Sequence, residues 1–334
     1  MAFPPSYLFF FISLISGVLI SISSPSWFSA WVGLELNMLS FIPLITIKMN
    51  SYLSESALKY FLIQALGSAL FIMSSCMFLS FFQLSPSLLL ASLLLKLGGA
   101  PFHFWFPQVM SGLTWFQVMI LMTLQKIGPM VLISYLSIYE NLIKIIYFSA
   151  ILSAIAGALG GLNMMNLRKM MAFSSINHMS WMLMSIVISD MFWILYFFFY
   201  SAISLSIITL FNMFQSFTMS DLMKSSQISS PTNSLLISLN LFSLGGLPPF
   251  TGFIPKWMLT QLLIDNNLLI PLIFLFSSAL ITLYFYLRAS IFFIFSTKPS
   301  SINNKFNMPY HSLPSSLLFF NFLMLFLPFI FLFL

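Results

Sequence analysis

Charged side chains are scarce in this sequence. Asp, Glu, Lys and Arg make up 5% of its 334 residues, hydrophobic residues make up 60%, and the mean hydropathy is +1.03. No folding of such a chain could place enough polar surface against water. The sequence therefore predicts an integral membrane protein in which residues 1–334 form a single transmembrane domain.

Cysteine is almost absent, because Cys76 is the single one in the chain. This excludes a disulfide framework within the chain and a zinc or iron–sulfur site held by cysteines. A P-loop lysine motif, a glycine-rich dinucleotide fingerprint and paired haem histidines are also missing from the sequence. We expect no cofactor and no metal in this chain, so any pumping must be driven by an ion gradient or by a partner subunit.

The alternation of apolar and polar residues that would predict strands is missing as well, and continuous apolar runs dominate. A helix needs roughly 20 apolar residues to cross the hydrocarbon. Breaks at Pro, Asn, Ser and charged residues divide this chain into about eleven such segments, so the sequence predicts an all-α membrane protein. The expected helices cover residues 5–23, 26–48, 56–82, 86–108, 113–137, 142–162, 170–189, 191–216, 234–266, 269–295 and 313–334.

Positive charge is concentrated in alternate loops. The loops after the second, sixth, eighth and tenth segments carry Lys48, Lys59, Arg168, Lys169, Lys224, Lys298 and Lys305, whereas the opposite loops offer Lys144. Because positive loops stay on the cytoplasm-like side, we expect the N-terminus there and the C-terminus on the other face. The first segment lacks a basic leader and a convincing cleavage site, so we expect it to remain as a span. The net charge of +6 is too scattered for a nucleic-acid-binding face.

Two of the expected helices contain backbone breakers. Gly98-Gly99-Ala100-Pro101-Phe102 interrupts the fourth, and Gly245-Gly246-Leu247-Pro248-Pro249-Phe250 interrupts the ninth. They are five spans apart, so the two broken helices cross the membrane in opposite senses. This pattern indicates an inverted repeat with halves at about 5–137 and 142–295 and a last helix at about 313–334, with an ion pathway beside the breaks. Simple proline kinks are the alternative.

Four charged residues fall near the centres of their expected helices: Glu35, Lys96, Lys126 and Lys256. Each would cost about 2.5–3.5 kcal/mol at a helix centre without a partner or water, and such residues usually serve ion transport. Burial weakens the hold of a lysine on its proton, and a nearby carboxylate restores it. The four residues therefore predict a proton relay at the midplane, although static ion pairs are the alternative.

Two histidines lie among these lysines in the sequence. His103 follows Lys96 by two turns, and His178 lies at the centre of the seventh expected helix, so both could pass protons between lysines. Structural histidines satisfied within the core are an equally open alternative. Linking waters could be held by Asn177, Gln64 and Gln125, whereas Arg288 and Lys59 are expected near the membrane interface.

Five stretches resemble the antiporter-like subunits of respiratory complex I, and the likeness covers nearly the whole chain, weakening after Arg288. They are Trp-Val-Gly-Leu-Glu35-Leu-Asn, Leu-Lys96-Leu-Gly-Gly-Ala-Pro-Phe-His103-Phe-Trp-Phe-Pro, Leu-Gln-Lys126-Ile-Gly-Pro, Asn-Leu-Arg168-Lys169-Met-Met-Ala-Phe-Ser-Ser-Ile-Asn-His178-Met-Ser-Trp-Met and Leu-Gly-Gly-Leu-Pro-Pro-Phe-Thr-Gly-Phe-Ile-Pro-Lys256-Trp. Bacterial members of that family have fourteen helices, so eleven implies loss of the first three, as in animal mitochondrial members.

The resemblance implies a proton-translocating role in NADH:ubiquinone oxidoreductase, in the mitochondrial inner membrane with a matrix-side N-terminus. It makes Glu35 the coupling carboxylate beside Lys96, Lys126 the central relay and Lys256 the terminal lysine, with His103 and His178 between them. Neighbouring antiporter-like subunits, accessory subunits and lipids such as cardiolipin would be partners. NADH, FMN, iron–sulfur clusters and ubiquinone would belong to other subunits. A stand-alone cation/proton antiporter and a purely structural scaffold are the rival interpretations.

Overall fold

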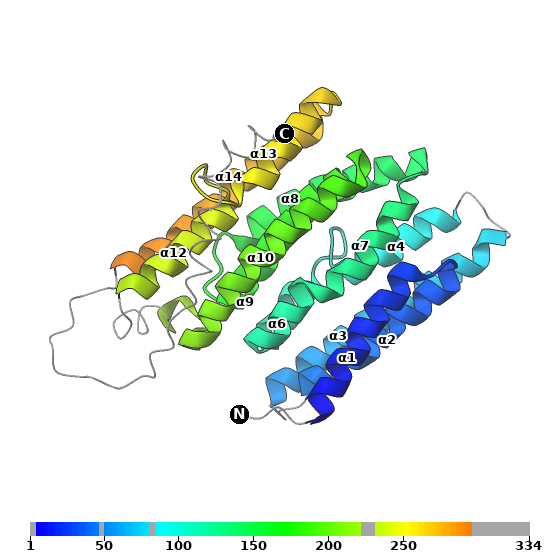
Figure 1. Ribbon diagram of the computed structural model, residues 1–334, viewed down its shortest axis with the longest axis horizontal. Helices are drawn as coiled ribbons and strands as arrows, with labels where there is room; N and C mark the ends of the chain where they lie inside the picture. Colours follow the sequence, from blue (N-terminus) through cyan, green and yellow to red (C-terminus); the bar gives the residue numbers. More distant parts are fainter. Residues whose placement is uncertain (1–4, 47–49, 80–83, 222–230, 296–334) are drawn as a thin grey trace, which may run out of the picture.

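The structure, a computed structural model, describes residues 5–46, 50–79, 84–221 and 231–295. Throughout this part of the chain the regular elements are helices, apart from one isolated bridge between Asn166 and Thr218. The predicted all-α class is therefore confirmed. Figure 1 shows long helices packed side by side in one slab, with the N-terminal helices at one end and α12 to α14 at the other.

The helices follow one another with short connections. They are α1 (Pro5–Ser23), α2 (Trp27–Thr46), α3 (Ser51–Cys76), α4 (Ser85–Leu97), α5 (Trp105–Gly112), α6 (Trp115–Met122), α7 (Leu124–Leu136), α8 (Glu140–Gly161), α9 (Leu167–Ile188), α10 (Asp190–Phe214), α12 (Pro231–Gly245), α13 (Phe253–Asp265) and α14 (Leu269–Phe295), and a short 3-10 turn, Met77–Leu79, extends α3.

The first ten expected helices all have counterparts among these elements. The expected fourth helix is α4 followed by α5, and the ninth is α12 followed by α13, so both predicted interruptions are present. Within the described ranges, eight spans are long and apolar enough to cross a membrane, and one of them, Trp115–Leu136, is α6 and α7 taken together. The expected helix at 313–334 lies outside the described residues.

A further interruption occurs in the expected fifth helix. Thr123 leaves the helical conformation, with φ −115° and ψ −80°, and separates α6 from α7. Its hydroxyl donates a hydrogen bond to the carbonyl oxygen of Met119 (2.7 Å). Lys126 therefore stands in the first turn of a separate helix and not in the middle of a continuous one.

Two helix pairs pack through the same close backbone contact. A Cβ atom at Gly17 of α1 would lie 2.9 Å from the carbonyl oxygen of Gly33 in α2, and one at Gly157 of α8 would lie 2.8 Å from the carbonyl oxygen of Phe173 in α9. Only glycine allows helices in lipid to approach this closely. The pair α1 and α2 and the pair α8 and α9 therefore share one packing mode.

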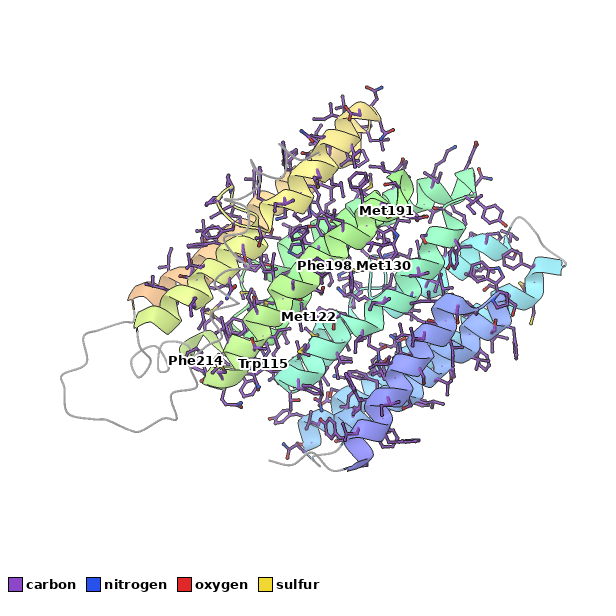
Figure 2. All side chains as sticks on the ribbon, in the orientation of Figure 1. Trp115, Met122, Met130, Met191, Phe198 and Phe214 are labelled. Carbon is purple, nitrogen blue, oxygen red and sulfur yellow. The ribbon has the colours of Figure 1, made fainter. Side chains whose placement is uncertain are left out.

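Large apolar side chains cover the outside of the molecule as well as its core. Figure 2 shows side chains projecting all around the helices; Met191 and Phe198 on α10 are exposed, whereas Trp115, Met122 and Met130 are buried. An apolar perimeter of this extent is the surface expected against lipid. The polar residues of interest must therefore be sought inside the bundle.

Candidate functional site

Lys256 lies at the break between α12 and α13. Its ammonium group donates hydrogen bonds to the carbonyl oxygens of Gly245 (2.8 Å) and Leu244 (3.4 Å), which end α12. These carbonyls have no partner within their own helix and carry the negative end of its dipole. Gly246 follows with φ +77°, a conformation suited to glycine. The break thus forms a cation-binding cradle for Lys256.

Lys96 lies at the corresponding place beside the first break, in the last turn of α4. Gly98 ends this helix with φ +72°. The carbonyl oxygen of Leu95 accepts a hydrogen bond from Trp105 of α5 (3.0 Å), and that of Lys96 accepts one from Gln64 of α3 (3.1 Å). The freed backbone groups are thereby satisfied by protein at membrane depth, as the bilayer requires.

Glu35 of α2 is the carboxylate that interacts electrostatically with Lys96. The two groups attract each other electrostatically, yet within the described residues the ion pair that forms below 4.0 Å is Lys59 with Glu55 on the surface. The Oε2 atom of Glu35 is buried and finds no hydrogen-bond partner in the described part of the chain. Glu35 and Lys96 are therefore coupled across a gap and do not form a closed, static pair.

Lys126 occupies the centre of the bundle and is only 2% exposed. Its ammonium group lies 5.4 Å from the ring centre of Phe106 and 5.2 Å from that of Tyr200, distances typical of cation–π attraction. The carbonyl oxygen of Ser175 in α9 lies 3.5 Å away. No carboxylate approaches it within ion-pair distance in the described ranges. Aromatic rings and one long hydrogen bond are thus what hold this cation.

His178 lies on α9 between two of the lysines. It is 6% exposed and interacts electrostatically with both Lys126 and Lys256. Its Nδ1 atom is 2.9 Å from the hydroxyl oxygen of Tyr196 on α10, and its ring is 5.0 Å from that of Tyr200. The structure therefore brings Lys126 and Lys256 close to His178, and these three residues are called the row below.

A small cavity adjoins His178 on the side of the second break. It is about large enough for one water molecule. Its walls come from α9, α10 and the two halves of the broken helix. The lining residues are His178, Tyr196, Tyr200, Ile203, Ser243, Leu244, Gly252 and Pro255.

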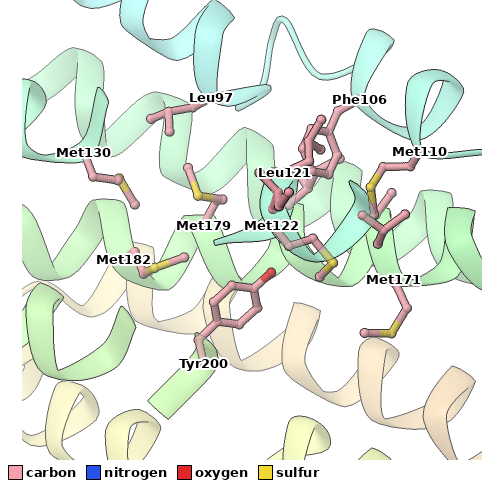
Figure 3. Close-up of a cluster of buried hydrophobic side chains, with 14 of the residues drawn as sticks. Leu97, Phe106, Met110, Leu121, Met122, Met130, Met171, Met179, Met182 and Tyr200 are labelled. Carbon is pink, nitrogen blue, oxygen red and sulfur yellow. The ribbon is translucent and has the colours of Figure 1, made fainter. Parts of the chain in front are cut away.

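Apolar side chains cluster with Phe106 and Tyr200, the two aromatic residues beside Lys126 (Figure 3). In Figure 3, Met122 and Met130 from α6 and α7 face Met179 and Met182 from α9, with Tyr200 on the far side. Methionine is unbranched and flexible, so it fills irregular gaps and can change its conformation readily.

His103 is placed differently from His178. It lies in the connection between α4 and α5, partly exposed, with its ring 4.2 Å from that of Phe104. Its Nδ1 atom is buried without a hydrogen-bond partner in the segments that the structure describes. The structure thus does not bring His103 into contact with the row formed by Lys126 and His178.

The three amides expected to hold waters also make direct contacts with protein groups. Gln64 binds the Lys96 carbonyl, as described above. Gln125 donates to the side chain of Asn37 (2.8 Å) and accepts from the hydroxyl of Tyr60 (3.2 Å). Asn177 donates to the hydroxyl of Thr282 (3.4 Å), and its own oxygen is left without a partner in the described part. These amides fix helices around the row.

The remaining basic residues considered from the sequence lie away from the centre. Lys59 is partly exposed and pairs with Glu55 at 2.6 Å. Arg168 donates to the carbonyl of Leu113, and Arg288 donates to that of Leu162 (3.3 Å), the residue that follows α8. Arg288 thus binds the end of α8 and does not simply extend into solvent.

Sequence reasoning missed three partners of the row: Ser175, Tyr196 and Tyr200. Ser175 is one turn from His178 on the same helix, so helical spacing could have found it. The tyrosines lie on α10, and nothing in their apolar sequence surroundings distinguishes them from other buried aromatic residues. Their contacts become visible only when α9 and α10 are packed.

The fold and the site define a class of protein: a helical membrane protein with two broken helices and a buried row of ionisable side chains between them. The family model of the NADH:quinone oxidoreductase/Mrp antiporter transmembrane region matches residues 24–282. The chain belongs to this family.

Relatives and a solved structure agree with that assignment. A protein of Anopheles gambiae named NADH-ubiquinone oxidoreductase chain 2 is 48% identical over 94% of this chain and 93% of its own length. Its namesake in Aedes aegypti is 49% identical over 84% of each chain. A chain of respiratory complex I from Thermus thermophilus matches with a TM-score of 0.81 and 21% identity, over 90% of this chain and 73% of that one, which shows a shared fold.

Proposed function

We propose that this chain is a proton-translocating membrane-arm subunit of NADH:ubiquinone oxidoreductase, a multi-pass protein of the mitochondrial inner membrane. It contributes to that enzyme without a redox centre of its own. The names of relatives at 48% and 49% identity point to this enzyme. The observation that carries the proposal is the row of buried lysines at and between two helix breaks, with His178 next to both Lys126 and Lys256.

The relay begins at Glu35 and Lys96, continues through Lys126 and His178, and ends at Lys256. Glu35 attracts Lys96, whereas Lys126 and Lys256 have no carboxylate within ion-pair distance in the described residues. Protons held by neighbouring groups therefore repel each other in this buried, low-dielectric region. A change in the position of Glu35 alters how tightly Lys96 holds its proton. The altered charge on Lys96 then changes the repulsion felt by the protons on the row. His103 has a place in this relay only if water connects it to Lys96.

The partners are other membrane-arm subunits, including neighbouring antiporter-like subunits, together with accessory subunits. Lipids such as cardiolipin fill the interfaces between them. NADH, FMN, iron–sulfur clusters and ubiquinone are bound by other subunits of the assembly. The residues of this chain that face its interior offer protons, carbonyl oxygens and aromatic rings.

The N-terminus faces the matrix and the C-terminus the intermembrane space. The alternate-loop charges support this orientation. Within the described residues, Arg168 and Arg288 both bind carbonyl groups at connections that lie after even-numbered spans. These two arginines therefore lie at the face where positive charge is expected.

The chain is one domain built as an inverted repeat, with halves at about 5–137 and 142–295 and the helix at about 313–334 outside them. Two matched contacts support this organisation. The α1–α2 and α8–α9 pairs pack through equivalent glycines. In addition, Asn37 of α2 bonds Gln125 of α7, while Asn177 of α9 bonds Thr282 of α14.

The experiment that tests this function separates native membrane complexes by size in mild detergent and identifies by mass spectrometry what migrates with the chain. The proposal expects recovery in a very large assembly with NADH dehydrogenase activity. A small homo-oligomer without redox subunits would contradict it and favour a stand-alone cation/proton antiporter; the family description also names an antiporter.

A further inference from the structure

Tyr196 is a buried polar residue to which the relay described above assigns no role. It lies on α10, is 2% exposed, and its hydroxyl oxygen is 2.9 Å from Nδ1 of His178. It is the side chain that hydrogen-bonds the imidazole within the described residues. In every protonation state of His178, its Nδ1 atom is therefore hydrogen-bonded to Tyr196.

A phenol hydroxyl can serve either state of the imidazole. It accepts a hydrogen bond when Nδ1 carries a proton, and it donates its own proton to Nδ1 when that nitrogen is bare. When His178 gains a proton at Nε2, Nδ1 keeps its proton and donates to the tyrosine oxygen. When the proton leaves from Nε2, the same contact remains, so no proton is lost to or gained from Tyr196.

We propose that Tyr196 is a positioning residue of the relay: its hydroxyl holds Nδ1 of His178, so that Nε2 is the nitrogen that exchanges protons with the neighbouring lysines and with water in the adjoining cavity. This inference rests on the proton-translocating function proposed above. The contact with Tyr196 determines which imidazole nitrogen exchanges protons, and the positions of the lysines alone do not determine this.

The surroundings hold Tyr196 in place. Its ring is stacked on that of Trp181, with centroids 6.5 Å apart and an angle of 11° between the planes. The small cavity is lined by His178, Tyr196 and Leu244, whose carbonyl oxygen also binds Lys256. A water there would lie between the imidazole and the cradle of Lys256.

The ionisable groups around this imidazole come from four helices. They are Lys126 of α7, Tyr196 and Tyr200 of α10, Lys256 of α13 and, next to the two tyrosines, Tyr286 of α14. None of them is a carboxylate. The hydroxyl of Tyr196 is therefore the group placed to stabilise a proton on Nδ1.

The test uses the assembled complex carrying Tyr196→Phe, which removes the hydroxyl and keeps the ring. We expect proton translocation to fall about tenfold, because leaving a buried donor unpaired typically costs about one power of ten in an equilibrium constant. NADH oxidation by a hydrophilic artificial acceptor and the amount of assembled complex should not change. Tyr284→Phe, at an exposed position on α14, is the matched control.

A second arm separates positioning from general structure. In a His178→Leu background, whose residual translocation is measured against an uncoupler-treated sample, Tyr196→Phe should cause no further loss, since leucine offers the tyrosine hydroxyl no hydrogen-bond partner. An equal loss in both backgrounds, or full translocation in Tyr196→Phe, would overturn the inference.

Two further observations keep the inference testable. If Tyr196→Phe does not assemble, a high-resolution structure of the unaltered complex decides: a hydroxyl beyond hydrogen-bond distance of Nδ1 would overturn it. If Lys126→Met and Lys256→Met leave translocation intact, the proposed function itself fails. If those variants stop translocation and Tyr196→Phe does not lower it, the role of Tyr196 alone fails.

Discussion

Lys256 reaches back across a helix break to donate a hydrogen bond of 2.8 Å to the carbonyl oxygen of Gly245, the last residue of α12. A cation from one half-helix is thus held by the end of the other half. The position of its ammonium group depends on the backbone conformation at the break, which is set by the next residue, Gly246.

Gly246→Ala should displace this ammonium group. The backbone at position 246 has a φ of +77°, which costs about 1–2 kcal/mol for a residue with a side chain. The added Cβ would also lie 2.9 Å from the side-chain nitrogen of Lys256. We expect less assembled complex and slower proton translocation in what assembles. Gly245→Ala is the control, because its Cβ would meet only ordinary contacts at 3.7 Å or more. Equal behaviour of the two variants would show that the break does not position Lys256.

Gln125→Leu should loosen the junction of α2, α3 and α7. It leaves the side chains of Asn37 and Tyr60 without their partner in a buried place, which costs about 1–3 kcal/mol. We expect the subunit to leave the complex at a lower temperature. Native gels of heated samples, with mass spectrometry of the bands, measure that temperature. Gln108→Leu, at an exposed position, serves as control. The same midpoint temperature for both variants would contradict the role given to Gln125.

Arg168→Met should weaken the contact between the start of α9 and the connection after α5. The guanidinium binds the carbonyl of Leu113 and lies 4.6 Å from the ring centre of Phe217. Losing a hydrogen bond to a charged group costs about 1.5–3 kcal/mol, so the assembled amount should fall at raised temperature. Lys169→Met removes an equal charge at the next position. If both variants lose the same amount, net charge and not this contact explains the loss.

The sequence was most informative where a polar residue or a backbone breaker interrupts an apolar run. Gly98 and Gly246 indicated the two breaks, and the mid-span lysines indicated buried cations. A broken backbone or a charged side chain is not tolerated against lipid unless protein or water surrounds it. Thr123 was missed, since one residue leaving the helical conformation changes neither hydropathy nor helix length. The boundaries of the broken helices followed from the Gly and Pro positions.

The connections between candidate site residues could not be read from the sequence. The expectation that Asn177 and Gln125 hold water stays a prediction, and the sequence did not reveal that each also binds a side chain from a distant helix. His103 and His178 looked alike as lone histidines among apolar residues. Packing separates them: one lies in a connection beside Phe104, the other beneath Tyr196 and between two lysines.

The most direct measurement is proton translocation by the assembled complex carrying Lys126→Met, with the exposed Lys144→Met as control. Lys126 is buried and has no carboxylate partner within ion-pair distance in the described residues, so its replacement removes the proposed proton carrier without leaving a buried charge unpaired. The account predicts that Lys126→Met assembles and lowers translocation at least tenfold, while Lys144→Met stays near the unaltered rate. Full translocation by an assembled Lys126→Met complex would contradict the relay.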